Sequence, residues 1–262
     1  MRQLLDLDRY PIDQPDSNDT AQLVQRCRAE LRSNGIFNLD GFVRPAVIAR
    51  AAAVIGPLSD SAAYQHERRH NIYFEERVAG LPADHPALLQ FQTVHHTLCA
   101  DQLVGTVIEQ IYEWPPLAAF LARVLDKPRL YLMGDPLARV NVLAYRPGET
   151  LNWHFDRSQY TTTLLIQAAE AGGEFQYRSG LRSRTDPNYE GVARLLRGED
   201  PQVAVHPLAA GTLNVFAGTN TAHRVTAVRG TSSRLIAVFS YYDQPGVSFG
   251  SAERIGFYGR AA

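Results

Sequence analysis

The sequence predicts an α+β protein with a jelly-roll core, also called a double-stranded β-helix, and with N-terminal helices packed on one outer face. Two observations support this fold class. Apolar residues recur with helical spacing mainly before Pro128, whereas the chain after Pro128 holds short alternating, β-branched and aromatic segments separated by Gly, Pro and Asn. A jelly roll is built from such strands and leaves a pocket between its two sheets.

The first elements are two helices with a strand between them. Cap residues at 18–20 and apolar residues at helical spacing predict a helix that ends at Asn34-Gly35, where Gly supplies a left-handed stop. A short strand is expected within 36–43. Pro45 begins a second helix that runs to about Ile55. Gly56-Pro57 is predicted to end it.

The middle of the chain is predicted to be a long loop followed by helices. Residues 58–87 lose the pattern and contain a dense polar cluster, so an ordered and functional loop is expected there. Helical spacing returns over about 88–112 and 117–125. Strands are then predicted at 130–133, 139–145, 161–167, 173–177, 212–216, 225–228 and 234–241.

No repeat, low-complexity tract or linker divides the chain, so we expect a single domain over residues 1–262. Within it, residues 1–128 would form mainly helical support and a substrate loop, 129–246 the jelly-roll core, and 247–262 a C-terminal tail.

Charge and composition argue against several kinds of partner. The chain has 26 Lys and Arg against 27 Asp and Glu, so its net charge of −1 gives no field that would attract nucleic acid or anionic lipid. The first residues lack an apolar leader, and no long apolar stretch follows. Cys27 and Cys99 fit packed free thiols better than a disulfide framework. We therefore expect a cytoplasmic protein, and the sequence allows a homodimer.

Three metal-capable side chains stand in two separate segments. His154 and Asp156 occupy positions i and i+2, which share one face of an extended segment, and His223 enters a strand after a polar turn. Two imidazoles and one carboxylate leave other positions of an ion open, which suits Fe(II) oxygen chemistry. A His-x-Asp pair alone is a weak signal, because structural His and Asp pairs are common.

Arg234 strengthens the metal hypothesis. It follows His223 by eleven residues, and it shares one strand face with Ile236, Val238 and Ser240. An inward guanidinium among mostly apolar neighbours needs an anion, and a carboxylate matches its two-pronged geometry.

In this order, the residues resemble the Fe(II)/2-oxoglutarate-dependent dioxygenases, in which a His-x-Asp pair, a distal His and a later Arg recur. Segments 145–148, 172–175 and 211–216 are similar to the prolyl-hydroxylase-type branch of that superfamily. The resemblance implies that His154, Asp156 and His223 bind Fe(II), with 2-oxoglutarate and O2 as co-substrates. It also implies that Arg234 pairs with the distal carboxylate of 2-oxoglutarate.

Two more residues are assigned to the co-substrate. Tyr145 lies on the strand before the first ligand, where the family often places a hydroxyl donor to the same carboxylate. Asn141 shares its face by alternation and could reach the other end of 2-oxoglutarate. Ordinary cross-strand packing is the alternative for both residues.

A narrower resemblance, based on segments 70–74, 135–141 and 152–156, is to small enzymes that act on free amino acids. This subgroup contains halogenases with Gly or Ala at the carboxylate position, as well as hydroxylases that keep the Asp. Asp156 therefore implies a hydroxylase that acts on an unactivated C–H bond of a small polar substrate, such as a free and even basic amino acid, and releases succinate and CO2.

A zwitterionic substrate needs charged or polar partners within the pocket. Arg157, just after the ligand segment, could take its carboxylate. The further substrate residues suggested are Asp135, His70, Ser240 and Tyr258, although solvent-exposed charge or ordinary packing also accounts for side chains of these types.

Two other functions remain open. Two His and one Asp can hold zinc with a water molecule, as in a hydrolase or lyase, but such an enzyme has no general need for Arg234. A non-catalytic jelly-roll binding protein is the second alternative, and it predicts a broken ligand set, whereas His154, Asp156 and His223 are all present.

Overall fold

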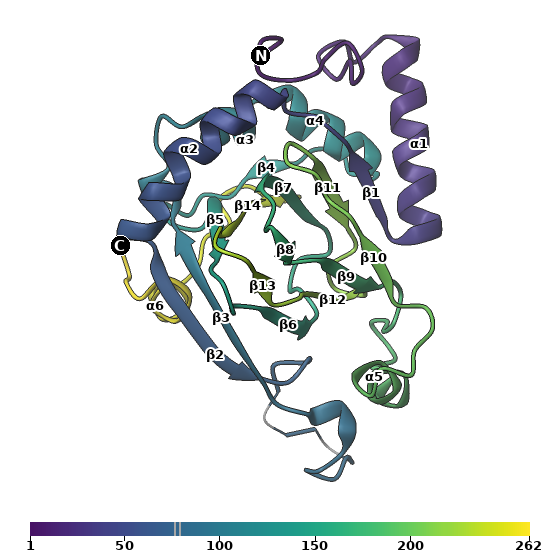
Figure 1. Ribbon diagram of the computed structural model, residues 1–262. Helices are drawn as coiled ribbons and strands as arrows, with labels where there is room; N and C mark the ends of the chain where they lie inside the picture. The colour runs from purple at the N-terminus through teal and green to yellow at the C-terminus, as the bar shows by residue number, and fades with distance from the viewer. Residues whose placement is uncertain (76, 79) are drawn as a thin grey trace.

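The computed structural model describes the chain of 262 residues except residues 76 and 79. Its strands form a seven-stranded sheet in the order β1-β11-β7-β14-β5-β3-β2 and a four-stranded sheet in the order β10-β9-β12-β6, together with the small pairs β13-β8 and β15-β4 (Figure 1). The strands are β1 (Ile36–Leu39), β2 (Tyr64–His70), β3 (Phe91–Leu98), β4 (Tyr131–Leu132), β5 (Val140–Tyr145), β6 (Leu151–His154), β7 (Thr161–Gln167), β8 (Ala171–Gly172), β9 (Phe175–Arg178), β10 (Ala204–His206), β11 (Leu213–Phe216), β12 (Ala222–Val225), β13 (Val228–Arg229), β14 (Arg234–Phe239) and β15 (Tyr241–Tyr242). The predicted jelly roll with N-terminal helices is confirmed.

Helices α1 (Asn18–Asn34), α2 (Pro45–Ala62), α3 (Val107–Tyr112) and α4 (Pro115–Val124) cover the outer face of the large sheet and are drawn from purple to teal in Figure 1. The chain also forms α5 (Tyr189–Leu196), α6 (Ser251–Tyr258) and short 3-10 turns at Pro86–Leu88 and Ala100–Gln102. The helix α1 ends at Gly35, whose φ of 72° is left-handed, as the sequence predicted. Of the helices, α5 and α6 lie outside this layer.

Alternation along β14 explains the two environments of the large sheet. Leu235, Ala237 and Phe239 pack into the main hydrophobic core with the helices. Arg234 and Ile236 face the other way, toward the interior of the jelly roll. One strand therefore anchors the fold with one face and supplies an interior wall with the other.

The prediction that α2 ends before Gly56-Pro57 is wrong, because the helix continues to Ala62. Proline removes one intrahelical hydrogen bond to the carbonyl four residues earlier, here that of Ala53. Ala53 and Pro57 are both exposed, so water can satisfy that carbonyl, while Ile55 and Ser59 continue the buried face of the helix across the interruption.

The predicted loop at 58–87 and helix at 88–112 are also partly wrong. Strands β2 and β3 form an antiparallel ribbon at the edge of the large sheet, with Leu98 of β3 paired to Val142 of β5. Strand β2 is polar, as edge strands often are. In β3, Phe91, Val94 and Leu98 happen to have helical spacing, and pairing with β5 overrides it.

Residues 1–128 thus contribute β1, β2 and β3 to the sheet in addition to the helical support. Cys27 and Cys99 are buried and free, as expected. Among the described residues, none of the helices has the length and apolar character needed to cross a membrane.

Candidate active site

His154, Asp156 and His223 come together at the small sheet. The two histidines are direct cross-strand partners on β6 and β12, and their ring centroids lie 4.0 Å apart. Nε2 of His154 is 3.4 Å from Oδ1 of Asp156, and Nε2 of His223 is 3.5 Å from Oδ2. One ligand atom from each residue lies within 4.8 Å of the others, so the three could hold one metal ion.

Backbone carbonyls set the orientation of both imidazoles. Nδ1 of His154 is 2.8 Å from the carbonyl of Asn152, and Nδ1 of His223 is 3.0 Å from that of Thr221. A carbonyl only accepts, so each Nδ1 carries a proton, and the other ring nitrogen, Nε2, is turned toward Asp156. Metal-binding histidines are commonly held in this way.

The Asp156 carboxylate is held by a threonine and by a close backbone approach. Thr161 donates its hydroxyl to Oδ2, and the Asp156 amide donates to the carbonyl of Gly218 at 3.1 Å. A Cβ atom at Gly218 would lie 2.6 Å from the Thr161 hydroxyl and 2.8 Å from Asp156. Gly218 is not among the residues predicted from the sequence, although its place in the turn before β12 marks a possible close backbone approach.

The charge states of this group suit a cation. Burial, followed by the nearby His223, lowers the pKa of His154, so that ring is neutral at pH 7. Burial alone would raise the pKa of Asp156, but the two histidines outweigh it and bring that pKa well below its ordinary value. Neutral imidazole and ionised carboxylate are the forms that coordinate metals.

Arg234 is a buried cation without a counter-ion among the described residues. It is 2% exposed, it pairs in register with Tyr145, and its guanidinium carbon lies 5.7 Å from the Tyr145 ring centre. Its Nη1 is buried and has no hydrogen-bond partner in the described part of the chain. Burial lowers the pKa of Arg234 to about 10, so it remains charged at pH 7. A Cβ at Gly173 would come within 3.0 Å of the Arg234 stem, which accounts for the glycine there.

A cavity of about 290 Å³ opens beside His154 and Asp156. Residues from both sheets and from the C-terminal segment line it. Of the sequence-predicted residues, the lining includes His154, Asp156, Asn141, His70, Arg157, Ser240 and Tyr258. Arg234 and Tyr145 lie on the same inward faces of β14 and β5, at the end opposite Ser240.

Several predicted contact residues already have partners. His70 bonds to Thr93 through Nε2 at 2.8 Å, and Ser240 donates to the carbonyl of Ala138 at 3.1 Å. Asn141 donates to the carbonyl of Leu137 at 2.7 Å and accepts from the Tyr258 hydroxyl at 3.0 Å. These side chains form a fixed wall of the cavity.

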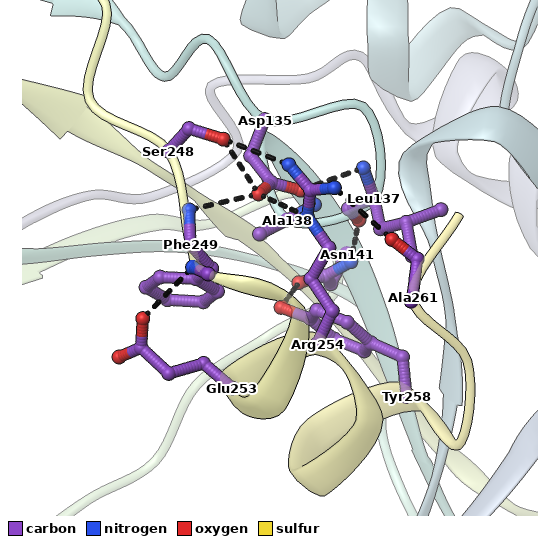
Figure 2. A network of polar contacts seen from close by, with 11 residues as sticks. Asp135, Leu137, Ala138, Asn141, Ser248, Phe249, Glu253, Arg254, Tyr258 and Ala261 are labelled. Atoms are coloured by element: carbon purple, nitrogen blue, oxygen red, sulfur yellow. Dashed lines mark hydrogen bonds and ion pairs between the residues drawn. The ribbon is translucent and has the colours of Figure 1, made fainter.

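The suggestion that Asp135 contacts substrate needs correction. Asp135 is 0% exposed and does not line the cavity. Its Oδ1 accepts from the amides of Leu137 and Ala138, while Oδ2 accepts from Ser248, Phe249 and Arg254 (Figure 2). All its acceptor positions face these donors, so the side chain is not available to a ligand.

Asp135 instead fixes the segment that closes one side of the cavity. Figure 2 shows Arg254 and Tyr258 of α6 reaching back from the helix to Asp135 and Asn141. Phe249, Phe257 and Tyr258 of this segment line the cavity. The predicted tail is thus part of the pocket.

Sequence analysis also missed the contribution of β2 and β3. Alternate residues on these paired strands, His66 and Arg68 on one and Thr93 and His95 on the other, line the cavity. His95 has a buried Nδ1 atom without a partner among the described residues. Residues 64–70 are polar almost throughout, so no alternation in the sequence marks them as a strand.

Three solved structures share this fold at low sequence identity. SnoN, a non-heme α-ketoglutarate-dependent epimerase from nogalamycin biosynthesis, is 15% identical over 85% of this chain and 82% of its own, with a TM-score of 0.58. A 2OG-Fe(II) oxygenase family oxidoreductase from Burkholderia pseudomallei is 16% identical over 86% and 92%, with a TM-score of 0.51. A prolyl hydroxylase from Trichoplax adhaerens is 12% identical over 88% and 96%, with a TM-score of 0.53.

At these identities the similarity shows a shared fold. No protein of curated function matches the sequence. A family model described as halogenase D matches residues 19–249, a range that includes the three clustered residues and Arg234. This match and the shared fold confirm the predicted resemblance to Fe(II)/2-oxoglutarate oxygenases. The chain belongs to the halogenase D family.

Proposed function

We propose that this protein is an Fe(II)- and 2-oxoglutarate-dependent hydroxylase of a small polar molecule, with a free amino acid as the first class to consider. The observation that carries the proposal is Arg234, a buried guanidinium on the interior face of β14 with no counter-ion among the described residues, in a fold that also brings two histidines and one carboxylate together. An unpaired buried charge is costly, so this arrangement favours a site completed by an anionic ligand.

The donor set fits Fe(II). His154, Asp156 and His223 would hold the ion through two Nε2 atoms and one carboxylate, which leaves other coordination positions for co-substrates. SnoN has been solved with Fe3+, α-ketoglutarate and nogalamycin RO, and HygX from Streptomyces hygroscopicus with nickel and 2-oxoglutarate. The shared fold supports the same ligands here.

The interior wall fits 2-oxoglutarate. Arg234 would pair with the carboxylate distant from the iron, because a guanidinium can donate two parallel hydrogen bonds to a carboxylate. Tyr145, its register partner, would donate its hydroxyl to the same group. Asn141 is also proposed to face the co-substrate, although its amide already bonds Leu137 and Tyr258, so its part would be to shape the wall.

The bound iron would supply the site at which O2 is activated. In the balanced reaction one oxygen atom enters succinate, the other enters the substrate C–H bond as a hydroxyl group, and 2-oxoglutarate loses CO2. Asp156 would favour this outcome over halogenation, because as a metal ligand its carboxylate would occupy a position otherwise open to a halide. Although the family is described as halogenase D, the presence of Asp156 favours hydroxylation.

Turnover of 2-oxoglutarate tests the proposal. Purified protein with Fe(II), 2-oxoglutarate and O2 is expected to form succinate, and His154→Ala should abolish it because one metal ligand is lost. Succinate would be measured in parallel with metal content. Retention of zinc, with hydrolytic activity and no consumption of O2 or 2-oxoglutarate, would instead favour the zinc enzyme.

A further inference from the structure

More positive than negative side chains line the cavity. Among the described lining residues, two guanidinium groups, from Arg68 and Arg157, face a single carboxylate, Asp156, which is a proposed metal ligand. A ligand with a cationic side chain would therefore find repulsion and no spare carboxylate. A ligand with an anionic group would find two partners.

Arg157 stands at the mouth of the cavity with unused donors. Its side chain is 69% exposed, and Nη1 bonds Glu253 at 3.0 Å. Its guanidinium carbon lies 5.4 Å from the Phe257 ring centre. A guanidinium has five N–H groups in a fixed fork, so one contact to Glu253 leaves donors for a carboxylate.

Arg68 faces the same opening from β2. Its guanidinium carbon lies 4.7 Å from the ring centre of Phe74, and no carboxylate among the described residues pairs with it. Phe74 is 38% exposed and has a φ of 59°, a left-handed conformation that a bulky residue rarely adopts. Such a conformation is retained where the surroundings impose it, often beside a binding site.

The interior beyond the two arginines is neutral and partly aromatic. Burial lowers the pKa of His66, His70 and His95, that of His95 to about 3, so these rings carry no charge at pH 7. Phe155, on the segment between His154 and Asp156, adds an aromatic wall. An apolar part of a substrate is accommodated here, whereas a buried ammonium group is not.

We propose that the substrate carries a carboxylate held at the cavity mouth by Arg157 and Arg68, and that it has no cationic side chain. Its apolar part points inward, past Phe74 and Phe155, toward the proposed iron site. This inference rests on the proposed function and narrows it, because it excludes the basic amino acids that the sequence resemblance suggested.

Matched small molecules test the charge preference. L-leucine, L-phenylalanine and 3-phenylpropionate have a carboxylate and an apolar part without a cationic side chain, whereas L-lysine, L-ornithine and L-arginine have a cationic side chain. With the Fe(II)-loaded protein, members of the first group are expected to stimulate succinate release above the substrate-free rate, and members of the second are not. Substrate binding would also be followed anaerobically as a perturbation of the Fe(II)–2-oxoglutarate absorption band.

Variants assign the preference to the two arginines. Arg68→Gln and Arg157→Gln should each raise KM for the most effective carboxylate at least about tenfold, since each removes a charge-assisted hydrogen bond. In each variant the rise in KM should exceed any fall in kcat, because the lost contact is made to the bound substrate. Arg69→Gln is the matched control, because Arg69 is the exposed neighbour of Arg68 on the other face of β2.

The inference is overturned if L-lysine, L-ornithine or L-arginine is preferred, if no member of the first group binds, or if both Arg variants keep the wild-type KM. In each of these cases, a normal Fe(II)–2-oxoglutarate absorption band in the wild-type protein would still support the proposed function. Loss of the band and of succinate formation in the wild-type protein would instead remove both proposals together.

Discussion

At the scale of single residues, the site depends on how closely the backbone approaches the side chains that could hold a metal ion. Gly218 lies so close to Asp156 and Thr161 that a Cβ atom would come within 2.8 Å of both. Such a contact forces the carboxylate or the threonine to move.

We expect Gly218→Ala to weaken Fe(II) binding by about 10–100-fold, because it displaces the group that orients a ligand. Metal titration followed by absorption or calorimetry would measure this. Gly56→Ala, at a position with no atom within 4 Å of the new Cβ, is the control and should bind iron normally. Normal affinity in the Gly218 variant would show that Asp156 does not depend on this contact.

Asp156 itself controls the reaction outcome in this account. Asp156→Gly removes the carboxylate and opens a coordination position, so hydroxylation should fall by more than about 100-fold. In chloride buffer, the absorption band of the loaded protein should become chloride-dependent. Mass spectrometry of the products would show whether a chlorinated product forms. A variant that hydroxylates at the wild-type rate would show that Asp156 is not a ligand.

The order and spacing of His154, Asp156 and His223 in the sequence mark them as candidate metal ligands, and the structure brings the three together. Their roles, and that of Arg234, stay predictions. The sequence could not predict the role of Asp135. The partners that bury this carboxylate come from residues 248–254, far along the chain, and only folding brings them together. For the same reason the sequence could not show that Phe257 lines the cavity. Phe257 reaches it because α6 packs against β2.

At the scale of elements, Asp135 holds residues 248–254 in place through hydrogen bonds, and this segment leads into α6, which lines the cavity. Burial alone would raise the pKa of Asp135, but hydrogen bonds from Leu137, Arg254, Phe249 and Ala138 outweigh this and lower it from 3.8 to about 2. The folded state therefore favours the ionised form. This contribution to stability is complete above about pH 4 and is lost as the pH falls toward 2.

Asp135→Asn should lower the free energy of unfolding at pH 7 by about 2–4 kcal/mol, because buried donors lose a charged acceptor. Chemical denaturation at several pH values would measure the difference from the wild type, which should shrink below pH 3. Asp243→Asn is the control, since Asp243 is an exposed partner of Lys127 and should change stability little. A difference that does not vary with pH would contradict the assigned pKa.

The errors in element prediction share one physical cause. Strand β2 has the polar sequence of a loop, and β3 has apolar residues at helical spacing, yet both are held by pairing with β5 across the sheet. Helix α2 passes Pro57 because its apolar face packs on the core on both sides of the proline. Tertiary contacts override local preference at these places.

At the scale of the whole molecule, the jelly roll was predictable because its strands alternate between two environments. The same alternation that packs Leu235 and Ala237 against the helices turns Arg234 inward. The sequence could not predict that strands β2 and β3 and helix α6 line the cavity, because a local sequence pattern does not specify which distant segments an element contacts. The single-domain boundaries stay a prediction.

The measurement that tests the account most directly is the visible spectrum of the anaerobic protein with Fe(II) and 2-oxoglutarate. Wild-type protein is expected to show the weak charge-transfer band of a chelated keto acid. Arg234→Ala should lose this band at moderate 2-oxoglutarate concentration and recover it at high concentration, whereas Arg229→Ala, at an exposed position of β13, should behave as wild type. Absence of the band in the wild-type protein, or an unchanged band in Arg234→Ala, would contradict the account.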